Sequence, residues 1–299
     1  MSFRNVIVQS PARISVKNSQ LIIATDRENS LPVEDISALL IESRQSTITA
    51  AALSLLGQCG CAVFVCDEKH LPCAVLEPFC QHSRQLGIIS AQLGLGEVLK
   101  KRLWQSVVAA KISNQAECLS LCGQTNASAG LKAMASSVRS GDSGNTEAAA
   151  AARYFLALFT PDFTRGKENG INSALNYGYA ILRGCMARYL TLYGFMPALG
   201  LHHRSELNSF NLADDMMEPF RPVVDLMVYS GVDASDDLSP EVKRMLFNCL
   251  NLDILSGGQK HSVSCAMERA VQSLQRSMAR NENVLVLPQL LPLNQHRYE

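Results

Sequence analysis

Residues 90–111 read SAQLGLGEVLKKRLWQSVVAAK, and this stretch separates two parts of the chain that differ in pattern. Its apolar residues recur every three or four positions and its basic residues lie between them, which predicts an amphipathic helix. Before about residue 83 the apolar runs are short and strand-like, whereas after it the helical spacing returns repeatedly. The sequence therefore predicts an α+β protein with more than one domain.

Five short apolar or alternating runs precede this helix, and Ser, Asn and Pro separate them. They are RNVIVQS, ARISVKN, QLIIAT, SALLIES and CAVFVCD, at residues 4–10, 12–18, 20–25, 37–43 and 61–67. Such runs are typical of strands joined by turns. Between the last two, ITAAALSLLGQCG is expected to form a short helix that ends at Gly57 or Gly60. Residues 1–80 are thus predicted to form a β-rich, sandwich-like and mainly antiparallel domain.

Four further helices are expected after residue 111. They cover residues 147–160, 172–194, 240–255 and 263–280. The polar segment ASSVRSGDSGN, residues 135–145, is predicted to be a loop that leads into the first of them. Residues 81–299 are therefore predicted to form a larger, all-α domain that follows the β-rich one.

The composition of the 299-residue chain excludes several classes of protein. With 47% hydrophobic and 18% charged residues, it is not a disordered chain. No apolar run reaches the roughly 18 to 20 residues that a membrane helix needs. The first residues, MSFRNVIVQS, lack the pattern of a signal peptide. We expect a cytoplasmic protein with no membrane partner.

Ten cysteines raise the question of a zinc site. Five lie close together, at Cys59, Cys61, Cys66, Cys73 and Cys80, but no CxxC pair occurs among them. Structural zinc sites usually carry such a pair. Cys61 and Cys66 belong to an apolar run, where cysteine acts as a small hydrophobe. Reduced and mostly buried thiols are the preferred interpretation.

The net charge is zero because 27 basic residues balance 27 acidic ones, but the balance is uneven along the chain. Counted by segment, the net charge is −2 over residues 1–83, +6 over 84–193 and −4 over 194–299. The basic middle permits a polyanionic partner bound through backbone phosphates, and ordinary solvated helix faces are the alternative. The basic residues in question are Arg84, Lys100, Lys101, Arg102, Lys111, Arg139, Arg153, Arg165 and Lys167.

Residues 201–225, LHHRSELNSFNLADDMMEPFRPVVD, hold the densest set of potential metal ligands. These are His202, His203, Glu206, Asp214, Asp215 and Glu218. If DDMME is helical, Asp214 and Asp215 share a face with Glu218, and Pro219 disturbs the helix just after it. Carboxylates with one imidazole suit a hard divalent cation such as Mg²⁺ or Mn²⁺. A surface helix rich in acidic residues is the competing interpretation, and spacing alone favours it.

Glu147 is a second candidate and lies far away in the sequence. It opens the alanine-rich helix EAAAAARYFLALF and is the one charged residue between Asp142 and Arg153. The helix dipole also favours a glutamate in the first turn. Taken alone, Glu147 indicates only the start of a helix.

Some residues have more modest expected roles. Arg221 and Asp225 are expected to pair near the acidic cluster and to orient Glu218. Trp104 is expected to pack in the core, and the tetrapeptide SGGQ at residues 256–259 is interpreted as an ordinary turn. Packing and helix capping are expected for Asn172, Asn176 and Tyr177.

Three segments together resemble a known family. Glu147 with EAAAAARYFLALF, residues 172–215 (NSALNYGYAILRGCMARYLTLYGFMPALGLHHRSELNSFNLADD) and residues 217–227 (MEPFRPVVDLM) resemble the CRISPR-associated adaptation integrase. The resemblance covers nearly the whole chain and is closest to members from type II systems. It implies that Glu147, His203 and Glu218 bind a divalent metal, Mg²⁺ or Mn²⁺, and carry the catalysis. Asp215 matches an acidic position that other members keep near the metal.

The resemblance also implies an architecture and an activity. The β-rich domain would mediate homodimerisation, and the helical domain would be catalytic. The family inserts short DNA fragments, the spacers, into a CRISPR array by attack of a 3′-hydroxyl on a repeat phosphodiester, which gives immunity against viruses and plasmids. A non-catalytic DNA-binding scaffold of the same fold and a general metal-dependent DNA repair nuclease are the alternatives.

The implied partners are DNA and several proteins. Two integrase dimers would flank one dimer of a small ferredoxin-like adaptation protein in a 4:2 complex. A ring-shaped DNA-binding accessory protein and the RNA-guided effector nuclease would also take part, as in type II systems.

Overall fold

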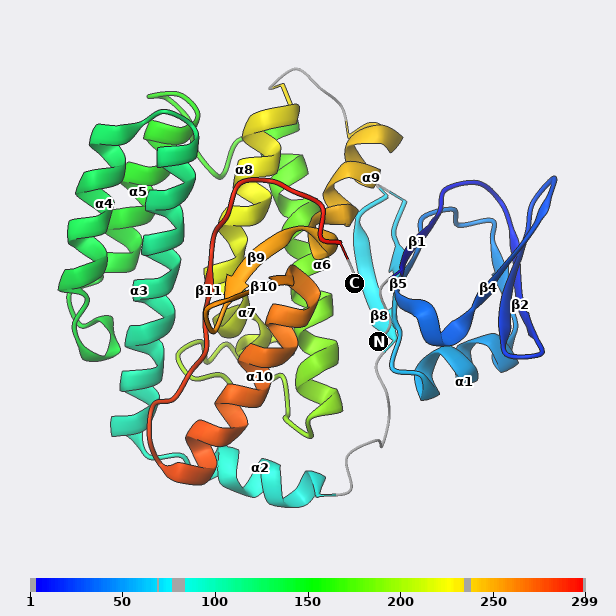
Figure 1. Ribbon diagram of the computed structural model, residues 1–299, viewed down its shortest axis with the longest axis horizontal. Coiled ribbons are helices and arrows are strands. Elements are labelled where there is room, and N and C mark those ends of the chain that lie inside the picture. Colours follow the sequence, from blue (N-terminus) through cyan, green and yellow to red (C-terminus); the bar gives the residue numbers. More distant parts are fainter. Residues whose placement is uncertain (1–3, 69, 77–83, 234–237, 298–299) are drawn as a thin grey trace. The chain divides into compact units, whose positions relative to one another are not determined.

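The structure is a computed structural model and describes residues 4–68, 70–76, 84–233 and 238–297. The chain forms two compact units, one up to residue 83 and one over residues 84–297 (Figure 1). Within the described ranges, no helix has both the length and the apolar character needed to cross a bilayer. Cys80, which belongs to the cysteine group considered for zinc, lies outside the described residues.

The first sheet of the N-terminal unit has the order β1-β5-β7-β8. Its strands are β1 (Arg4–Val8), β5 (Ile36–Ile41), β7 (Ala62–Cys66) and β8 (Pro72–Leu76). β5 pairs in parallel with both β1 and β7, and only β7 and β8 are antiparallel. The prediction of a mainly antiparallel domain is therefore wrong for this sheet. Between β5 and β7 the chain crosses over through helix α1 (Ala50–Gln58), and between β1 and β5 it passes through the strands of the second sheet, so both connections return it in the same direction.

The second sheet has the order β4-β3-β2-β6. Its strands are β2 (Arg13–Lys17), β3 (Gln20–Ala24), β4 (Glu28–Pro32) and β6 (Thr47–Ile48). β2, β3 and β4 form an antiparallel meander, to which β6 adds in parallel beside β2. The predicted strands at residues 4–10, 12–18, 20–25, 37–43 and 61–67 are all confirmed.

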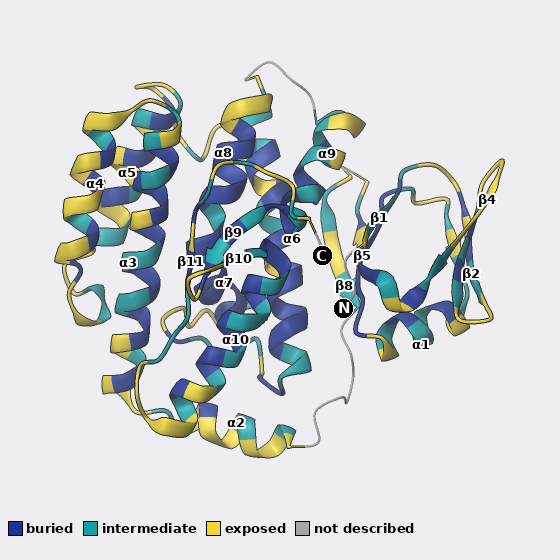
Figure 2. Ribbon diagram, viewed as in Figure 1, coloured by how far each residue is buried: buried dark blue, intermediate teal, exposed yellow. Residues whose placement is uncertain are grey.

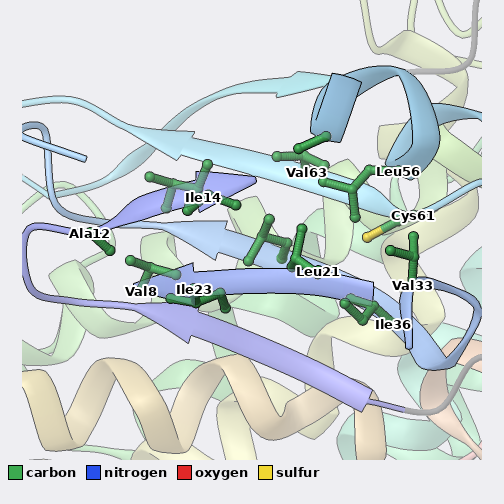
Figure 3. Packing of buried hydrophobic residues seen from close by; sticks show 13 residues of the cluster. Val8, Ala12, Ile14, Leu21, Ile23, Val33, Ile36, Leu56, Cys61 and Val63 are labelled. Atoms are coloured by element: carbon green, nitrogen blue, oxygen red, sulfur yellow. The ribbon is translucent and has the colours of Figure 1, made fainter. Parts of the chain in front are cut away.

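One apolar core lies between the two sheets and α1 (Figure 3). Ile14 and Leu21 of the second sheet, Ile36 of the first and Leu56 of α1 are completely buried there. Cys61 and Cys66 are also buried, as small hydrophobic residues. The Thr49 hydroxyl accepts a hydrogen bond from the Ala52 N–H and so caps α1. The N-terminal unit is thus sandwich-like, as predicted.

The larger unit begins with two helices where one was predicted. α2 (Gln85–Leu93) and α3 (Glu97–Leu121) are separated at Gly94 and Gly96. Glycine is a poor helix former, so two glycines within three residues break the amphipathic pattern into two segments. α3 is the long helix of this unit, and α4 and α5 lie beside it (Figure 1).

A helix that the sequence analysis missed follows α3. α4 (Thr125–Ser137) is rich in Ala, Ser and Gly and extends into the first three residues of the predicted loop, residues 135–145, which are therefore helical. The rest of that loop holds the short 3₁₀ helix η2 (Ser140–Asp142). α5 (Thr146–Leu158) and α6 (Gly170–Leu192) occur where helices were predicted. Asn172 is buried, and the neighbouring Asn169 caps α6 by accepting from its N–H.

α6 is the central helix and contacts α7 (Asn211–Met217), α8 (Arg221–Gly231), α9 (Pro240–Phe247) and α10 (Val263–Arg280). Figure 2 shows α6 largely buried, whereas α2 and α4 expose much of their surface. At Gly178 a Cβ atom would lie 2.4 Å from Val224 Cγ1, so only glycine allows α6 and α8 to approach this closely. The 3₁₀ helix η3 (Glu218–Phe220) joins α7 directly to α8.

The end of this unit is not entirely helical. The helix predicted over residues 240–255 stops at Phe247, continues as the 3₁₀ helix η4 (Asn248–Asn251) and gives way to strand β9 (Asp253–Ser256). β9 pairs with β10 (Gln259–Ser262) and β11 (Pro288–Gln289) in a small antiparallel sheet. The SGGQ turn joins β9 to β10, with both glycines at positive φ. The larger unit is mainly helical, as predicted, but the expectation that it is all-α is wrong, because it contains this sheet.

Candidate active site

Three separate segments bring oppositely charged side chains together in the larger unit. Lys111 comes from α3, Glu147 from the first turn of α5, and Glu218 from η3. The Lys111 ammonium lies 2.5 Å from Glu147 Oε1 and 2.5 Å from Glu218 Oε2. We call these three residues the carboxylate layer. Lys111 and Glu147 are 36 positions apart in the sequence and Glu218 lies much farther along the chain, yet their side chains meet.

Burial and charge have opposite effects on the ionisation of this layer. Burial lowers the pKa of Lys111, but the Glu218 and Glu147 carboxylates outweigh it and leave the pKa raised. Burial raises the pKa of Glu218, but Arg221 and Lys111 outweigh it and leave the pKa lowered. Arg221 Nη2 lies 3.1 Å from Glu218 Oε1. Both side chains are therefore charged at neutral pH.

Lys111 corrects one expectation. Its charge placed it among the candidate contacts to DNA backbone, but its side chain is only 7% exposed and points to the two glutamates. Arg165, another member of that group, donates to Asn172 and Asn176. A basic residue type does not reveal whether its side chain faces solvent.

Asp142 orients Glu147 through the backbone. Its carboxylate accepts from the N–H of Thr146 (2.8 Å) and of Glu147 (3.0 Å). Asp142 therefore interacts with the positive end of the α5 dipole, a role that was expected for Glu147. The Glu147 carboxylate is left to contact Lys111.

The acidic segment on α7 is helical, but its three acids point to different partners. Asp214 accepts from Arg183 Nε (2.6 Å) and Asn208 Nδ2 (2.7 Å). Asp215 contacts the histidine segment, and Glu218 faces Lys111. All three carboxylates nevertheless act on the His203 ring, whose pKa they raise. The predicted disturbance at Pro219 is confirmed, because α7 changes into the 3₁₀ helix η3 at Glu218.

Asp215 is completely buried and holds the backbone that carries His203. Its carboxylate accepts from the N–H of Leu201 (2.6 Å), His202 (2.9 Å) and His203 (3.3 Å), and it lies 2.6 Å from His203 Nδ1. Because this carboxylate already accepts from three backbone N–H groups, we assign the proton of the fourth contact to Nδ1. With Nδ1 held by Asp215, Nε2 is the ring nitrogen of His203 that could bind a metal.

Two further contacts fix this histidine. The hydrogen bond to Asp215 raises the pKa of His203 against the effect of burial. The Trp104 ring of α3 stacks on His202 with centroids 4.3 Å apart and meets His203 edge-on at 5.8 Å. At Gly200 a Cβ atom would lie 2.3 Å from the His203 carbonyl oxygen, so this close turn requires glycine. Trp104 is buried, as predicted.

A pocket of about 500 Å³ borders His203. α2, α3 and the segment from Ala198 to Asn211 line it, and its charged side chains include Lys100, Arg204, Glu97 and Glu206. Two basic and two acidic side chains thus lie around the opening beside the histidine, and Glu97 pairs with both Lys100 and Arg204.

The donor set fits a hard divalent cation in kind, since it offers two carboxylates and an imidazole nitrogen. The space between Glu147 and Glu218 already receives a positive group, the Lys111 ammonium. In the part of the chain that the structure describes, no three His, Cys, Asp or Glu side chains are grouped closely enough to hold a metal as they stand. His203 meets α3 at Trp104, two helical turns before Lys111.

A second group of buried side chains comes from the same three segments. Seven residues beyond each member of the carboxylate layer stand Cys118, Tyr154 and Asp225, which we call the phenol layer. The Tyr154 hydroxyl donates to Asp225 (2.9 Å), and the Tyr179 hydroxyl of α6 donates to its other oxygen. Burial raises the pKa of Asp225 to about 6, although both phenols act in the opposite direction.

Arg221 connects the two layers. Its guanidinium contacts Glu218 and lies 4.9 Å from the centre of the Tyr179 ring. The direct contact between Arg221 and Glu218 supports the expectation that Arg221 orients Glu218. Asp225, by contrast, has the two tyrosines as its hydrogen-bond partners rather than Arg221.

Comparison with known proteins identifies the family. The family model described as CRISPR associated protein Cas1 matches residues 6–236. The chain belongs to the Cas1 family. The CRISPR-associated endonuclease Cas1 of Neisseria meningitidis serogroup C (strain 8013) is 45% identical over 304 residues, which cover 100% of both chains. A Cas1 endonuclease of Pyrobaculum aerophilum is 27% identical and covers 75% of this chain and 80% of its own.

Solved structures show the same fold at low identity. A casposase bound to its integration product has a TM-score of 0.74 at 18% identity, with 94% of this chain and 91% of that chain covered. A Cas1 protein from Thermotoga maritima has a TM-score of 0.72 at 15% identity, with 94% and 99% covered. Membership of the family makes this chain a CRISPR adaptation protein of the endonuclease and integrase class.

Proposed function

We propose that this Cas1 protein is a divalent-metal-dependent integrase and endonuclease that inserts short foreign DNA fragments into a CRISPR array. The observation that carries the proposal is the meeting of Glu147 and Glu218 around a cationic group, in the domain that also presents His203 with Nδ1 held by Asp215. These are the three residues implied by the family resemblance. Similarity to a casposase bound to an integration product supports the same class of chemistry.

The protein residues have defined roles in this proposal. Glu147, His203 and Glu218 would hold Mg²⁺ or Mn²⁺, which would polarise the phosphodiester and stabilise charge on the attacking and leaving oxygens. Asp215 keeps the proton on Nδ1, so that His203 offers Nε2. Arg221 keeps Glu218 ionised. The 3′-hydroxyl of the incoming fragment attacks the repeat phosphate in line with the departing 3′-oxygen, and positioning supplies much of the rate.

The partners are proposed on the same basis. The N-terminal unit mediates homodimerisation, and two dimers assemble with one dimer of a small ferredoxin-like protein in a 4:2 complex on DNA. A structural relative occurs in a Cas6-RT-Cas1–Cas2 complex, with a TM-score of 0.70 and 94% of this chain covered. A ring-shaped accessory protein and the RNA-guided effector nuclease complete the set.

An integration assay tests the proposal. Wild-type protein, with and without the small partner, is incubated with a DNA fragment, a repeat-containing plasmid and Mn²⁺ or Mg²⁺. Glu147→Ala, His203→Ala and Glu218→Ala should each abolish strand transfer while the variants still fold and dimerise. Glu117→Ala removes an exposed glutamate of α3 that pairs with Lys132, and it is the matched control.

Three results would contradict the proposal. Full integration by all three variants would show that these residues do not form the catalytic site. Equal cleavage of plasmids with and without the repeat, and no joined product, would favour a general nuclease. Repeat binding with no metal-dependent product would favour a scaffold.

A further inference from the structure

Lys111 stands where a cation between the two glutamates would stand. Its ammonium contacts both Glu147 and Glu218 at 2.5 Å, and its side chain is 7% exposed. Burying a lysine is costly unless its charge is paired, so its position depends on these two carboxylates. Glu147 in turn has Lys111 as its ion-pair partner among the described residues.

The charges around this point balance. Glu147 and Glu218 supply two negative charges, and Lys111 and Arg221 supply two positive ones. Arg221 approaches Glu218 on Oε1, whereas Lys111 approaches it on Oε2. Removal of Lys111 alone would therefore leave Glu147 and one oxygen of Glu218 facing each other, and two unscreened carboxylates repel.

We infer that Lys111 is an internal counter-ion that occupies the space between Glu147 and Glu218 and that a divalent cation must displace to bind there. This inference rests on the proposed function, because it assumes that these glutamates are metal ligands. Lys111 thus maintains the arrangement of the two glutamates without metal and competes with metal for them. It is a positioning residue that weakens the affinity of the DNA-free protein for the cation.

Displacement has an electrostatic consequence. Once a dication neutralises both glutamates, the ammonium of Lys111 and the guanidinium of Arg221 are no longer offset. The centre then changes from neutral to a net charge of two positive units, which attracts backbone phosphate. The released ammonium has a phosphate oxygen as its natural new partner. Binding of metal and binding of DNA therefore assist each other through Lys111, and by linkage the coupling is reciprocal.

The test is the Mn²⁺ affinity of the full-length protein without DNA, measured by calorimetry or by the spin-resonance signal of free Mn²⁺. Lys111→Met removes the competing charge and should bind Mn²⁺ about tenfold more tightly or better, the factor that corresponds to about 1.4 kcal/mol. Without metal, the same variant should melt at a lower temperature than wild type, and Mn²⁺ should raise its melting temperature more. Unchanged or weaker Mn²⁺ affinity in Lys111→Met would overturn the inference.

Control variants separate the possible outcomes. Lys132→Met removes an exposed lysine that pairs with Glu117, and it should change neither Mn²⁺ affinity nor melting temperature. Lys111→Gln provides a second neutral variant. If neither Lys111 variant folds even in excess Mn²⁺, the lysine has a structural role that metal cannot replace, and the inference is wrong.

A last comparison distinguishes this inference from the proposed function. Glu218→Gln should lose the Mn²⁺ binding of wild type. If Glu218→Gln and wild type bind Mn²⁺ equally, the cation does not bind at these glutamates, and the proposed function fails. If Glu218→Gln loses the metal but Lys111→Met binds it as wild type does, only the role of Lys111 fails.

Discussion

The carboxylate layer and the phenol layer come from the same three segments of chain, seven residues apart in each. Lys111 precedes Cys118 on α3, Glu147 precedes Tyr154 on α5, and Glu218 precedes Asp225 on the η3–α8 segment. Seven residues are about two helical turns, so each segment presents the same face twice. Each layer contains a buried carboxylate, Glu218 or Asp225.

The two carboxylates differ because their partners differ. Glu218 contacts two cations, which hold its pKa below the ordinary value in spite of burial. Asp225 contacts two phenols, which donate hydrogen bonds but carry no charge, and burial raises its pKa to about 6. The comparison teaches that burial alone does not determine the charge of an acid: cationic partners keep the buried Glu218 charged, whereas Asp225, bonded to neutral donors, has a raised pKa.

One substitution in each layer, both on α5, tests most directly whether the two layers have different roles. Glu147→Gln should lower integration by at least about 100-fold, because losing about 2.7 kcal/mol of metal-based stabilisation has that effect. Tyr154→Phe should leave integration close to wild type but lower the free energy of unfolding by about 1.5–3 kcal/mol, since Asp225 loses a donor. A gel-based integration assay and urea unfolding measure the two effects. A greater loss of integration in Tyr154→Phe than in Glu147→Gln would contradict the division.

Asp215→Asn tests whether this acid acts through His203. The change removes the negative charge and replaces one of the two accepting oxygens by an NH₂ group, which weakens the contact to Nδ1 and should lower integration about 10- to 100-fold. Since the hydrogen bond to Asp215 is the main cause of the raised His203 pKa, the pKa of His203 should also fall. Nuclear magnetic resonance titration of the ring measures this second readout. An unchanged His203 pKa together with lost activity would indicate a general folding defect.

Asp225 gives the phenol layer a characteristic pH dependence. Its pKa is about 6 in the folded protein, above its ordinary value of 3.8, so the folded state binds more protons between about pH 4 and pH 6. Its contribution to stability is present below pH 4 and is lost as the pH rises through 6. Asp225→Asn should therefore flatten the pH dependence of unfolding by about 2–3 kcal/mol over this range. Urea unfolding of wild type and variant at several pH values measures this contribution as the difference between their free energies of unfolding. If the two free energies depend on pH in the same way, the prediction is wrong.

The smallest expected effect concerns Tyr179, which lies between the layers. Tyr179→Phe keeps the ring beside Arg221 but removes a hydroxyl donor to Asp225. Its hydrogen bond lowers the pKa of Asp225, so the pH midpoint attributed to Asp225 should move upward. The cost to stability at neutral pH should be about 1–2 kcal/mol. Tyr229→Phe, at a partly exposed tyrosine, is the control and should leave that midpoint in place.

Much of the fold follows from local pattern. The helix at residues 263–280 has the predicted bounds, because a strong amphipathic repeat starts directly after the capping Ser262. α4 was missed because its Ala, Ser and Gly carry no apolar stripe, and packing beside α3 and α5 stabilises it instead. β9 was missed because its apolar residues continue those of the preceding helix.

The site was predictable only in part. The resemblance selected Glu147, His203 and Glu218, but residue type placed Lys111 on the surface. A signal was present: Lys111 follows Trp104 and Val107 by seven and four residues, on the buried face of α3. The role of Asp215 could not be predicted, since three consecutive backbone N–H groups point at it only in the folded turn.

The segment that carries His203, residues 194–210, contains no helix or strand of its own. Its attachments come from elsewhere: Gln92 of α2 donates to the carbonyls of Met196 and Leu199, and Asn211 and Asp215 hold its later part. Contacts this distant in sequence form late, after the helices themselves. During refolding, circular dichroism should therefore regain its final value before the protein becomes competent to act on DNA.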